Sequence, residues 1–288
     1  MKCDLHVHTR FSGMCTIPVL RHFCRESYNE PLAVYETLKQ RGMDLVTVTD
    51  HDAIGASEEL RKFDDFFLSE EVTCILPSGN ELHVGVYNIT ERQHLELQRR
   101  RNDMPSFTEY LAEQRLFSSA NHVFSALTGS RTADDFRVME ASFPALEVRN
   151  GQMPETSNAH AARLARLQRK AVVAGSDCHT LASLGRTFTE IAGARSTQDY
   201  FDLLRRGAAV ACGEHGNYAK LTKDVLRIGG SWMAESRWAT VLFPLAAVAP
   251  LVTLASSVAE HRFADRWSRR LLASEPLGPA IAALQESA

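Results

Sequence analysis

The sequence predicts an α/β fold in which parallel strands form a barrel. Short apolar runs alternate with longer helical patterns about seven times before residue 216, as expected when each strand is followed by a helix. Clusters of histidine and acidic residues lie at the ends of the apolar runs, where the reactive groups of such barrels gather. A chain of 288 residues, 44% of them hydrophobic, is long enough for one large domain with an appendage.

The expected strands are short apolar runs at 2–8, 45–49, 72–87 (long enough for two strands), 117–121, 145–149, 171–175 and 208–212. The expected helices lie between them, at 31–41, 57–67, 91–101, 107–114, 133–141, 157–168 and 198–206. Gly207 follows the last of these helices, and glycine is common just after a helix end. We therefore place the barrel domain at residues 1–216.

The first strand carries the strongest local signal. Asp4, His6 and His8 alternate with Leu5 and Val7, so both imidazoles are expected on one face of the strand. Similar clusters follow at Thr49-Asp50-His51-Asp52, Gly79-Asn80-Glu81-Leu82-His83, Asn121-His122 and Gly175-Ser176-Asp177-Cys178-His179. One His-x-His pair is a weak metal signal, whereas five clusters that each end an apolar run are a strong one.

Imidazole nitrogens and carboxylate oxygens are donors that divalent metals prefer. The clusters supply more candidate ligands than one tetrahedral ion can use, namely His6, His8, His51, Glu81, His83, His122, Asp177 and His179. We therefore expect two or three divalent ions per chain, of zinc, manganese or iron. Two ions about 3.5–4 Å apart, with a shared water or hydroxide, commonly hydrolyse phosphate esters.

Taken in order, the motifs resemble those of the PHP (polymerase and histidinol phosphatase) family. The resemblance covers residues 1–216 and rests on Asp-Leu-His-Val-His, Thr-Asp-His-Asp, Gly-x-Glu, His-Val-Gly-Val-Tyr, Leu-Glu-Val-x-Asn and Gly-Ser-Asp-x-His. It implies a distorted (β/α)7 barrel with a trinuclear metal site. The implied ligands are His6, His8, Glu81 and Asp177 for the first ion, Glu81, His83 and His122 for the second, and His51 and His179 for the third.

The third ion lacks a ligand that the family usually provides. An Asp or His is expected five or six positions after His8, where this chain has Gly13 and Met14. Cys15 is the nearest substitute, as a thiolate that would favour zinc, and the alternative is that this cysteine is structural. Water or substrate could also complete the third site.

Four residues beside the strand-end motifs are candidates for catalytic roles. Asp52 could donate a proton to the leaving group, or could cap the following helix. Arg10, Arg149 and Arg186 could each hold a phosphate through paired hydrogen bonds, or form a surface ion pair. With the resemblance, these residues imply a metal-dependent phosphoesterase that hydrolyses a small phosphomonoester or nucleotide phosphate by metal-bridged hydroxide.

Two other functions stay open. An amidohydrolase-type enzyme that cleaves C–N bonds fits the His-x-His start equally well, although the strand-end clusters contain no lysine that could be carbamylated. A non-catalytic metal-binding regulatory module fits the missing ligand and the unusual C-terminal region. Assaying an aryl phosphate beside an amide substrate, with manganese or zinc added, separates the two hydrolases.

Composition narrows the expected partners. The net charge is −3 and no basic run suggests binding of a phosphate backbone across a broad surface, so bulk nucleic-acid binding is not favoured. The expected partner is a small phosphorylated substrate or a nucleotide. The six cysteines lack CxxC spacing, and Met1-Lys2 leads straight into the first strand, which together favour a cytoplasmic location.

Residues 217–288 are expected to form a helical, partly apolar extension. The stretch from Trp238 to Ala259 carries no charge and is long enough to cross a bilayer. Pro244 and Pro250 interrupt it, and arginines flank both sides, so charge does not orient it. Residues 238–259 could therefore contact the inner face of a membrane, or could form a hairpin packed on the barrel.

Overall fold

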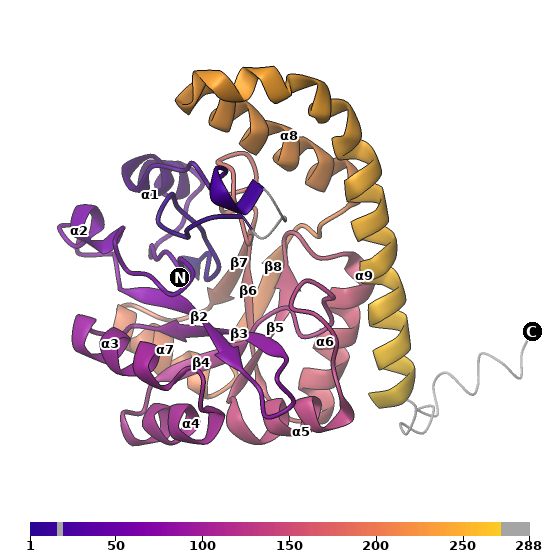
Figure 1. The fold of residues 1–288 in the computed structure, drawn as a ribbon. Coiled ribbons are helices and arrows are strands. Elements are labelled where there is room, and N and C mark those ends of the chain that lie inside the picture. The colour runs from indigo at the N-terminus through magenta and orange to yellow at the C-terminus, as the bar shows by residue number, and fades with distance from the viewer. Residues whose placement is uncertain (16–19, 272–288) are drawn as a thin grey trace, which may run out of the picture.

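The computed structural model describes residues 1–15 and 20–271 (Figure 1). Within these residues the strands are β1 Lys2–Cys3, β2 Ser69–Ile75, β3 Glu81–Tyr87, β4 Phe117–Ala120, β5 Ala145–Asn150, β6 Ala171–Gly175, β7 Thr187–Ile191 and β8 Ala209–Gly213. The helices are α1 Pro31–Gln40, α2 Ser57–Leu60, α3 Glu91–Arg100, α4 Met104–Glu113, α5 Ala133–Ser142, α6 Glu155–Leu167, α7 Thr197–Arg205, α8 Tyr218–Glu235 and α9 Ala249–Leu271. Two 3-10 helices, η1 Leu20–His22 and η2 Arg237–Val248, complete the described elements.

The strands form two sheets of mixed direction. One sheet has the order β2-β3-β4-β5-β6, with antiparallel pairs on the β2 side and parallel pairs from β4 to β6. The other, β1-β7-β8, is antiparallel throughout. The α/β class is therefore as predicted, but the assigned sheets do not by themselves make a closed (β/α)7 barrel.

The expectation of parallel strands fails first at β2 and β3. Only residues 76–80 connect these strands, and Gly79 in that turn has a φ of +84°. So short a connection can join only antiparallel neighbours, because a parallel pair needs a crossover of about a dozen residues or more. β7 is a further strand that was not among those expected from the sequence. Burial alternates along Thr187–Ile191, which is the two-residue period of a strand.

Two extended segments connect the edges of the five-stranded sheet. Next to β6, the Leu5 N–H donates to the Ala174 carbonyl (3.4 Å), and Val7 forms a parallel bridge with Cys178. The Thr49 N–H donates to the Val7 carbonyl (2.8 Å), and next to β2 the Glu71 N–H donates to the carbonyl of Asp50 (3.2 Å). The segments that carry the first two histidine motifs thus lie between β6 and β2.

The main core lies between the five-stranded sheet and its covering helices. Its buried side chains come from β2 to β5, from α3 to α6 and from α9. Phe263 and Trp267 of α9 belong to this core, and the Trp267 ring centroid lies 5.0 Å from that of Phe136 in α5. The extension is therefore packed onto the α/β part of the chain.

The helical extension predicted for 217–288 is observed as α8, η2 and α9, and its last residues, 272–288, lie outside the described residues. In Figure 1, α8 passes over one end of the strands and α9 descends beside α6. The apolar stretch 238–259 is divided between η2 and α9. Among the described helices, none is long and apolar enough to span a bilayer. Contact of this stretch with a membrane surface stays a prediction, as does the domain boundary at residue 216.

Candidate metal centre

All of the predicted ligands except Glu81 meet at one buried site. Together with two unpredicted carboxylates they form what we call the donor cluster, which consists of His6, His8, Glu26, His51, Glu71, His83, His122, Asp177 and His179. Within it, four groups of three residues place their donor atoms within 4.8 Å of one another. Side chains from distant parts of the sequence therefore converge at a single point.

Glu71 occupies the middle of the donor cluster. Its Oε2 atom lies 3.1 Å from His6 Nε2, 3.3 Å from His51 Nδ1 and 3.5 Å from His8 Nε2. Its Oε1 atom lies 3.4 Å from His122 Nε2 and 3.6 Å from His83 Nδ1. The two oxygens of one carboxylate thus face two different sets of imidazoles, as a carboxylate shared by two metal ions would.

The prediction that Glu81 is the bridging ligand is wrong, because the register of the β2–β3 hairpin places Glu81 away from the donor cluster. Glu81 pairs with Ile75 at the turn end of the β2–β3 hairpin, and its side chain is exposed. Glu71 pairs with Gly85 farther along the hairpin and is 1% exposed. An acidic residue at the start of an apolar strand, as in Glu71-Val72, is the signal that could have identified it.

His6, His8 and Asp177 form the part of the cluster next to β6. Asp177 Oδ1 lies 3.3 Å from His8 Nε2 and 3.5 Å from His6 Nε2. The Asp177 N–H also donates to the His6 carbonyl (2.7 Å), so the backbone holds the two motifs together. Asp177 has a φ of +50° and His122 of +29°. Such strained backbone in non-glycine residues is concentrated at functional sites.

Glu147 and Asn150 of β5 support the cluster from behind, and the sequence analysis assigned no role to Glu147. Glu147 Oε1 lies 2.8 Å from His6 Nδ1, and its Oε2 accepts the His122 N–H (2.9 Å). The Asn150 amide donates to Glu147 Oε2 and to Asp177 Oδ2, each at 3.0 Å. These contacts fix the His6 ring so that its Nε2 atom points to the centre of the donor cluster. Carboxylates commonly orient metal-binding histidines in this way, by accepting a hydrogen bond from the ring nitrogen that does not bind the metal.

Glu26 supplies a carboxylate beside His51 and His179, where the sequence motifs lacked a ligand for the third ion. Its Oε1 lies 3.1 Å from His179 Nε2 and its Oε2 lies 3.6 Å from His51 Nε2. The Glu26 N–H donates to the carbonyl of Gly13 (3.1 Å), the position at which a ligand was expected. Cys15 instead packs with the apolar cluster around Cys24 and Trp232, which favours its structural interpretation.

Electrostatics keep the cluster's carboxylates ionised. Burial raises the pKa of Glu71, but the charges of the neighbouring imidazoles, His6 first, outweigh it and hold that pKa well below its usual range. The same balance holds the pKa of Asp177 well below its usual range, again chiefly through His6. Burial lowers the pKa of His8 to about 4 and that of His83 to about 3, whereas the nearby carboxylates, Glu71 first, outweigh burial at His6 and His51 and raise the pKa of His6 well above its usual range and that of His51 to about 10. Metals bind ionised carboxylates and neutral imidazoles, so an ion bound by His6 or His51 would displace a ring proton.

The donor set fits divalent metal ions. His8 Nε2 and His83 Nδ1 are buried and form no hydrogen bond with another described residue, although Asp177 Oδ1 and Glu71 Oε1 lie 3.3 and 3.6 Å from them. Burying such atoms unpaired is costly, and a cation that accepts their lone pairs would remove the cost. Nitrogen and oxygen donors in this mixture suit zinc, manganese and iron.

The four predicted catalytic residues make their contacts elsewhere. Asp52 accepts the Thr73 N–H (2.9 Å) and pairs with Arg101, so its carboxylate holds β2 and does not face the cluster. The predicted arginines are engaged as well: Arg10 with Glu30 (3.2 Å), Arg149 with the Gly213 carbonyl (2.8 Å) and Arg186 with Glu214 (3.1 Å). The structure does not place a proton donor or a phosphate clamp at these positions.

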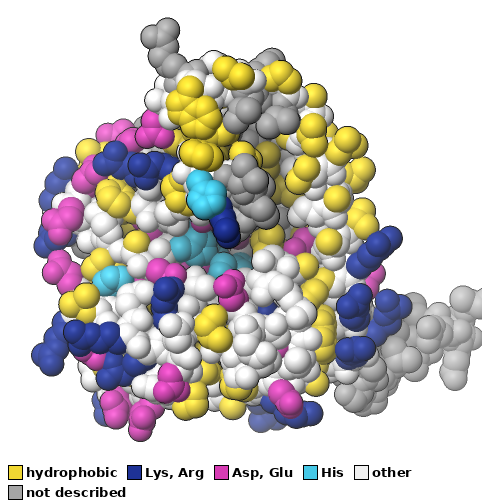
Figure 2. All heavy atoms as spheres, viewed as in Figure 1, with side chains coloured by type: hydrophobic (Ala, Val, Ile, Leu, Met, Phe, Trp, Pro, Cys, Tyr) yellow, Lys and Arg dark blue, Asp and Glu magenta, His cyan; other side chains and the backbone are white. Residues whose placement is uncertain are grey.

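A cavity of about 540 Å³, which we call the site cavity, opens onto the donor cluster. Glu26, Asp177 and His179 line one end, and the helical extension lines the other. Figure 2 shows histidine side chains deep in a hollow, with hydrophobic side chains of the extension above them. Arg25 is the only lysine or arginine among the described residues that line the site cavity.

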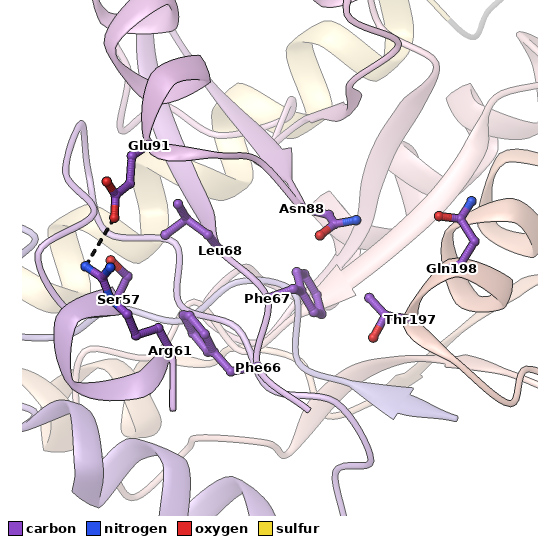
Figure 3. Close-up of a pocket in the computed structure, with 9 residues that line it drawn as sticks. All are labelled: Ser57, Arg61, Phe66, Phe67, Leu68, Asn88, Glu91, Thr197 and Gln198. Atoms are coloured by element: carbon purple, nitrogen blue, oxygen red, sulfur yellow. Dashed lines mark ion pairs between the residues drawn. The ribbon is translucent and has the colours of Figure 1, made fainter. Parts of the chain in front are cut away.

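A second cavity, of about 510 Å³, lies between α2, the segment before β2 and α7. None of the described residues lining it belongs to the donor cluster. Figure 3 shows Arg61 paired with Glu91 at one side of this pocket (3.1 Å), with Phe66 next to Arg61 and Phe67 nearer to Thr197. The candidate functional site is therefore the first cavity.

The chain is similar to known proteins over part of its length. Residues 155–209 match the family model PHP_C, described as PHP-associated. An uncharacterized protein of Methanocaldococcus jannaschii is 35% identical to this chain over 72 residues, which span 25% of this chain and 41% of the archaeal protein.

Solved structures share the fold of this chain at low sequence identity. A two-domain protein of Bacteroides vulgatus containing a predicted PHP-like metal-dependent phosphoesterase superposes with a TM-score of 0.57 at 18% identity, over 77% of this chain and 68% of its own. PsfC from Pseudomonas syringae gives 0.56 at 17%, over 81% of this chain and 98% of its own. A lesion-specific endonuclease from Pyrococcus furiosus gives 0.51 at 16%, over 73% and 57% of the respective chains.

Proposed function

We propose that the protein is a metal-dependent phosphoesterase that hydrolyses a small phosphomonoester or nucleotide phosphate. One observation carries the proposal: the two oxygens of Glu71 face separate sets of imidazoles. A carboxylate in this position suits a pair of neighbouring divalent ions, the arrangement used in many phosphoester hydrolases. We further propose that the strands and the segments at 5–8 and 46–51 together make the distorted barrel typical of PHP domains.

The residues of the donor cluster divide into three ligand sets in this proposal. His6, His8 and Asp177 would hold a first ion with Glu71, and His83 and His122 would hold a second on the other oxygen of Glu71. His51, His179 and Glu26 would hold a third. When bound, such ions would polarise the phosphoryl group and lower the pKa of a water molecule.

The chain's other residues would orient these groups and attract the substrate. Glu147 fixes the His6 ring through Nδ1, and Asn150 holds Asp177 through Oδ2. Arg25 lines the site cavity beside Glu26, where its guanidinium donates to the Arg10 carbonyl (3.3 Å) and lies 3.8 Å from Glu235. As the one lysine or arginine side chain among the described residues that line the cavity, it would still attract a phosphate dianion. The chain's residues thereby supply binding and orientation.

A phosphate-release assay tests the proposal. The protein loaded with manganese or zinc should release phosphate from an aryl phosphate, and Asp177→Asn should lower kcat/KM at least about 100-fold by removing a ligand charge. Asp134→Asn is the matched control, because Asp134 is exposed and pairs with Arg137 on the surface. Full activity in Asp177→Asn, or cleavage of an amide without any phosphate release, would refute the proposal.

A further inference from the structure

The site cavity has two chemically different ends. At one end Glu26, Asp177 and His179 of the donor cluster reach its surface. At the other end the wall is almost entirely hydrophobic and comes largely from α8 and α9. A phosphate held at the cluster would therefore have the rest of its molecule directed along an apolar surface.

The face that α8 turns to the cavity is that of an amphipathic helix. Leu221, Val225, Ile228 and Trp232 follow each other at helical spacing, and all four line the cavity. Of these only Trp232 is buried, while the other three are half-buried. An apolar helix face left partly open beside a cavity of ligand size is typical of a binding pocket, since such pockets commonly measure about 300–1,000 Å³.

The two carboxylates that α8 and α9 contribute to the cavity wall are occupied by the protein itself. Asp224 accepts hydrogen bonds from Thr180 (2.9 Å), Gln152 (3.1 Å) and Arg227 (3.0 Å). Glu260 accepts from the Ala126 N–H (3.1 Å) and from Ser125 (3.2 Å). Neither carboxylate is therefore free to bind the hydroxyls of a ribose or the amino group of a base, which argues against a nucleotide.

Two of the wall's buried polar side-chain atoms are not occupied. The buried Trp232 Nε1 and the Gln152 Oε1 have no hydrogen-bond partner within the described part of the chain. Both residues line the cavity. A bound group with one acceptor or one hydroxyl on a hydrophobic body would satisfy an atom that is costly to leave unpaired.

From these observations we propose that the site cavity binds the alcohol part of the substrate, and that the substrate is a phosphomonoester of a bulky hydrophobic alcohol. This inference rests on the proposed phosphoesterase function. In the reaction, the oxygen of water forms a bond to phosphorus and the bond from phosphorus to the alcohol oxygen breaks. The products are the free alcohol, which receives a proton, and inorganic phosphate.

A chain-length series tests the cavity. Methyl, butyl and octyl phosphate release primary alcohols of similar basicity, so their intrinsic reactivities are close. We expect kcat/KM of the metal-loaded protein to rise two- to fourfold per buried methylene, and so at least about tenfold from butyl to octyl phosphate below its micelle concentration. AMP should be the poorer substrate.

Two neighbouring glycines of α8 provide matched variants. Gly229 lines the cavity and Gly230 does not. An added Cβ meets nothing within 4 Å at either position, and phenylalanine is a better helix former than glycine. Gly229→Phe should fill the cavity and remove the chain-length preference, whereas Gly230→Phe should retain both that preference and the activity on methyl phosphate.

Binding of non-hydrolysable phosphonates provides a readout besides turnover. Calorimetry should show octylphosphonate binding the metal-loaded protein at least tenfold more tightly than methylphosphonate, and Gly229→Phe should abolish the difference. Equal affinities, or a preference for AMP, would overturn the inference even if methyl phosphate is hydrolysed. Octylphosphonate binding without hydrolysis of any ester would uphold the cavity assignment and refute the phosphoesterase function.

Discussion

Replacing Glu71 tests the metal centre most directly. Glu71→Gln keeps the shape of the side chain and its acceptor for the Asn121 amide, which donates to Glu71 Oε1 at 2.8 Å. The variant removes the one negative charge that lies within 3.6 Å of five imidazoles. Its fold should therefore survive while its affinity for metal falls.

The size of the effect follows from Coulomb's law. Two unit charges about 4 Å apart interact by about 4 kcal/mol at an effective dielectric constant near 20. Burying a neutral amide costs less than burying a carboxylate, which offsets part of this loss. Because about 1.4 kcal/mol corresponds to a tenfold change in an equilibrium constant, we expect the ions next to Glu71 to bind about 100- to 1,000-fold more weakly.

Glu81→Gln is the matched control, because the same substitution is made on the same hairpin. Glu81 is exposed and lies at the turn end, so its replacement should change metal affinity less than about threefold. Metal content after dialysis and titration of the metal-free protein with manganese measure both variants, and circular dichroism checks their folding. If Glu81→Gln lost its metal while Glu71→Gln kept it, the register argument would be refuted.

Three further predictions concern the third ion, the docking of α9 and stability. Glu26→Gln should lower the metal content by about one ion per chain, since the imidazoles that Glu26 pairs with in the described part of the chain are those of His51 and His179; loss of all metal would contradict a separate third site. Glu260→Ala should lower the free energy of unfolding by about 1–3 kcal/mol, because the half-buried Ala126 N–H and the buried Ser125 hydroxyl lose their acceptor, whereas the exposed Asp265→Ala should change it by less than about 0.5 kcal/mol; equal urea midpoints would disprove this. Chelation should lower the melting temperature and added manganese should restore it, because an ion at about 100 times its Kd contributes about 2.7 kcal/mol; an unchanged melting curve would count against bound metal.

Local patterns in the chain were sufficient to predict most of the donor cluster. The alternation of Asp4, His6 and His8 and the acidic and histidine residues at strand ends follow from the two-residue period of a strand, and the structure brings these histidines together. The strand–helix alternation likewise predicted the α/β class. The start of α3 likewise depends only on residues close together in the sequence, because Thr90 and Gln93 form a capping box.

Tertiary structure decided which carboxylates join the imidazoles. Glu71 rather than Glu81 faces the cluster because of the register of the β2–β3 hairpin, and a shift in register moves every side chain relative to its partners. Glu26 reaches His51 and His179 only because its loop returns beside Gly13. The site cavity needs α8 and α9 to fold back over the strand ends. These contacts join residues far apart in the sequence. Such contacts depend on how the whole chain folds, so no periodic pattern in the sequence indicates them.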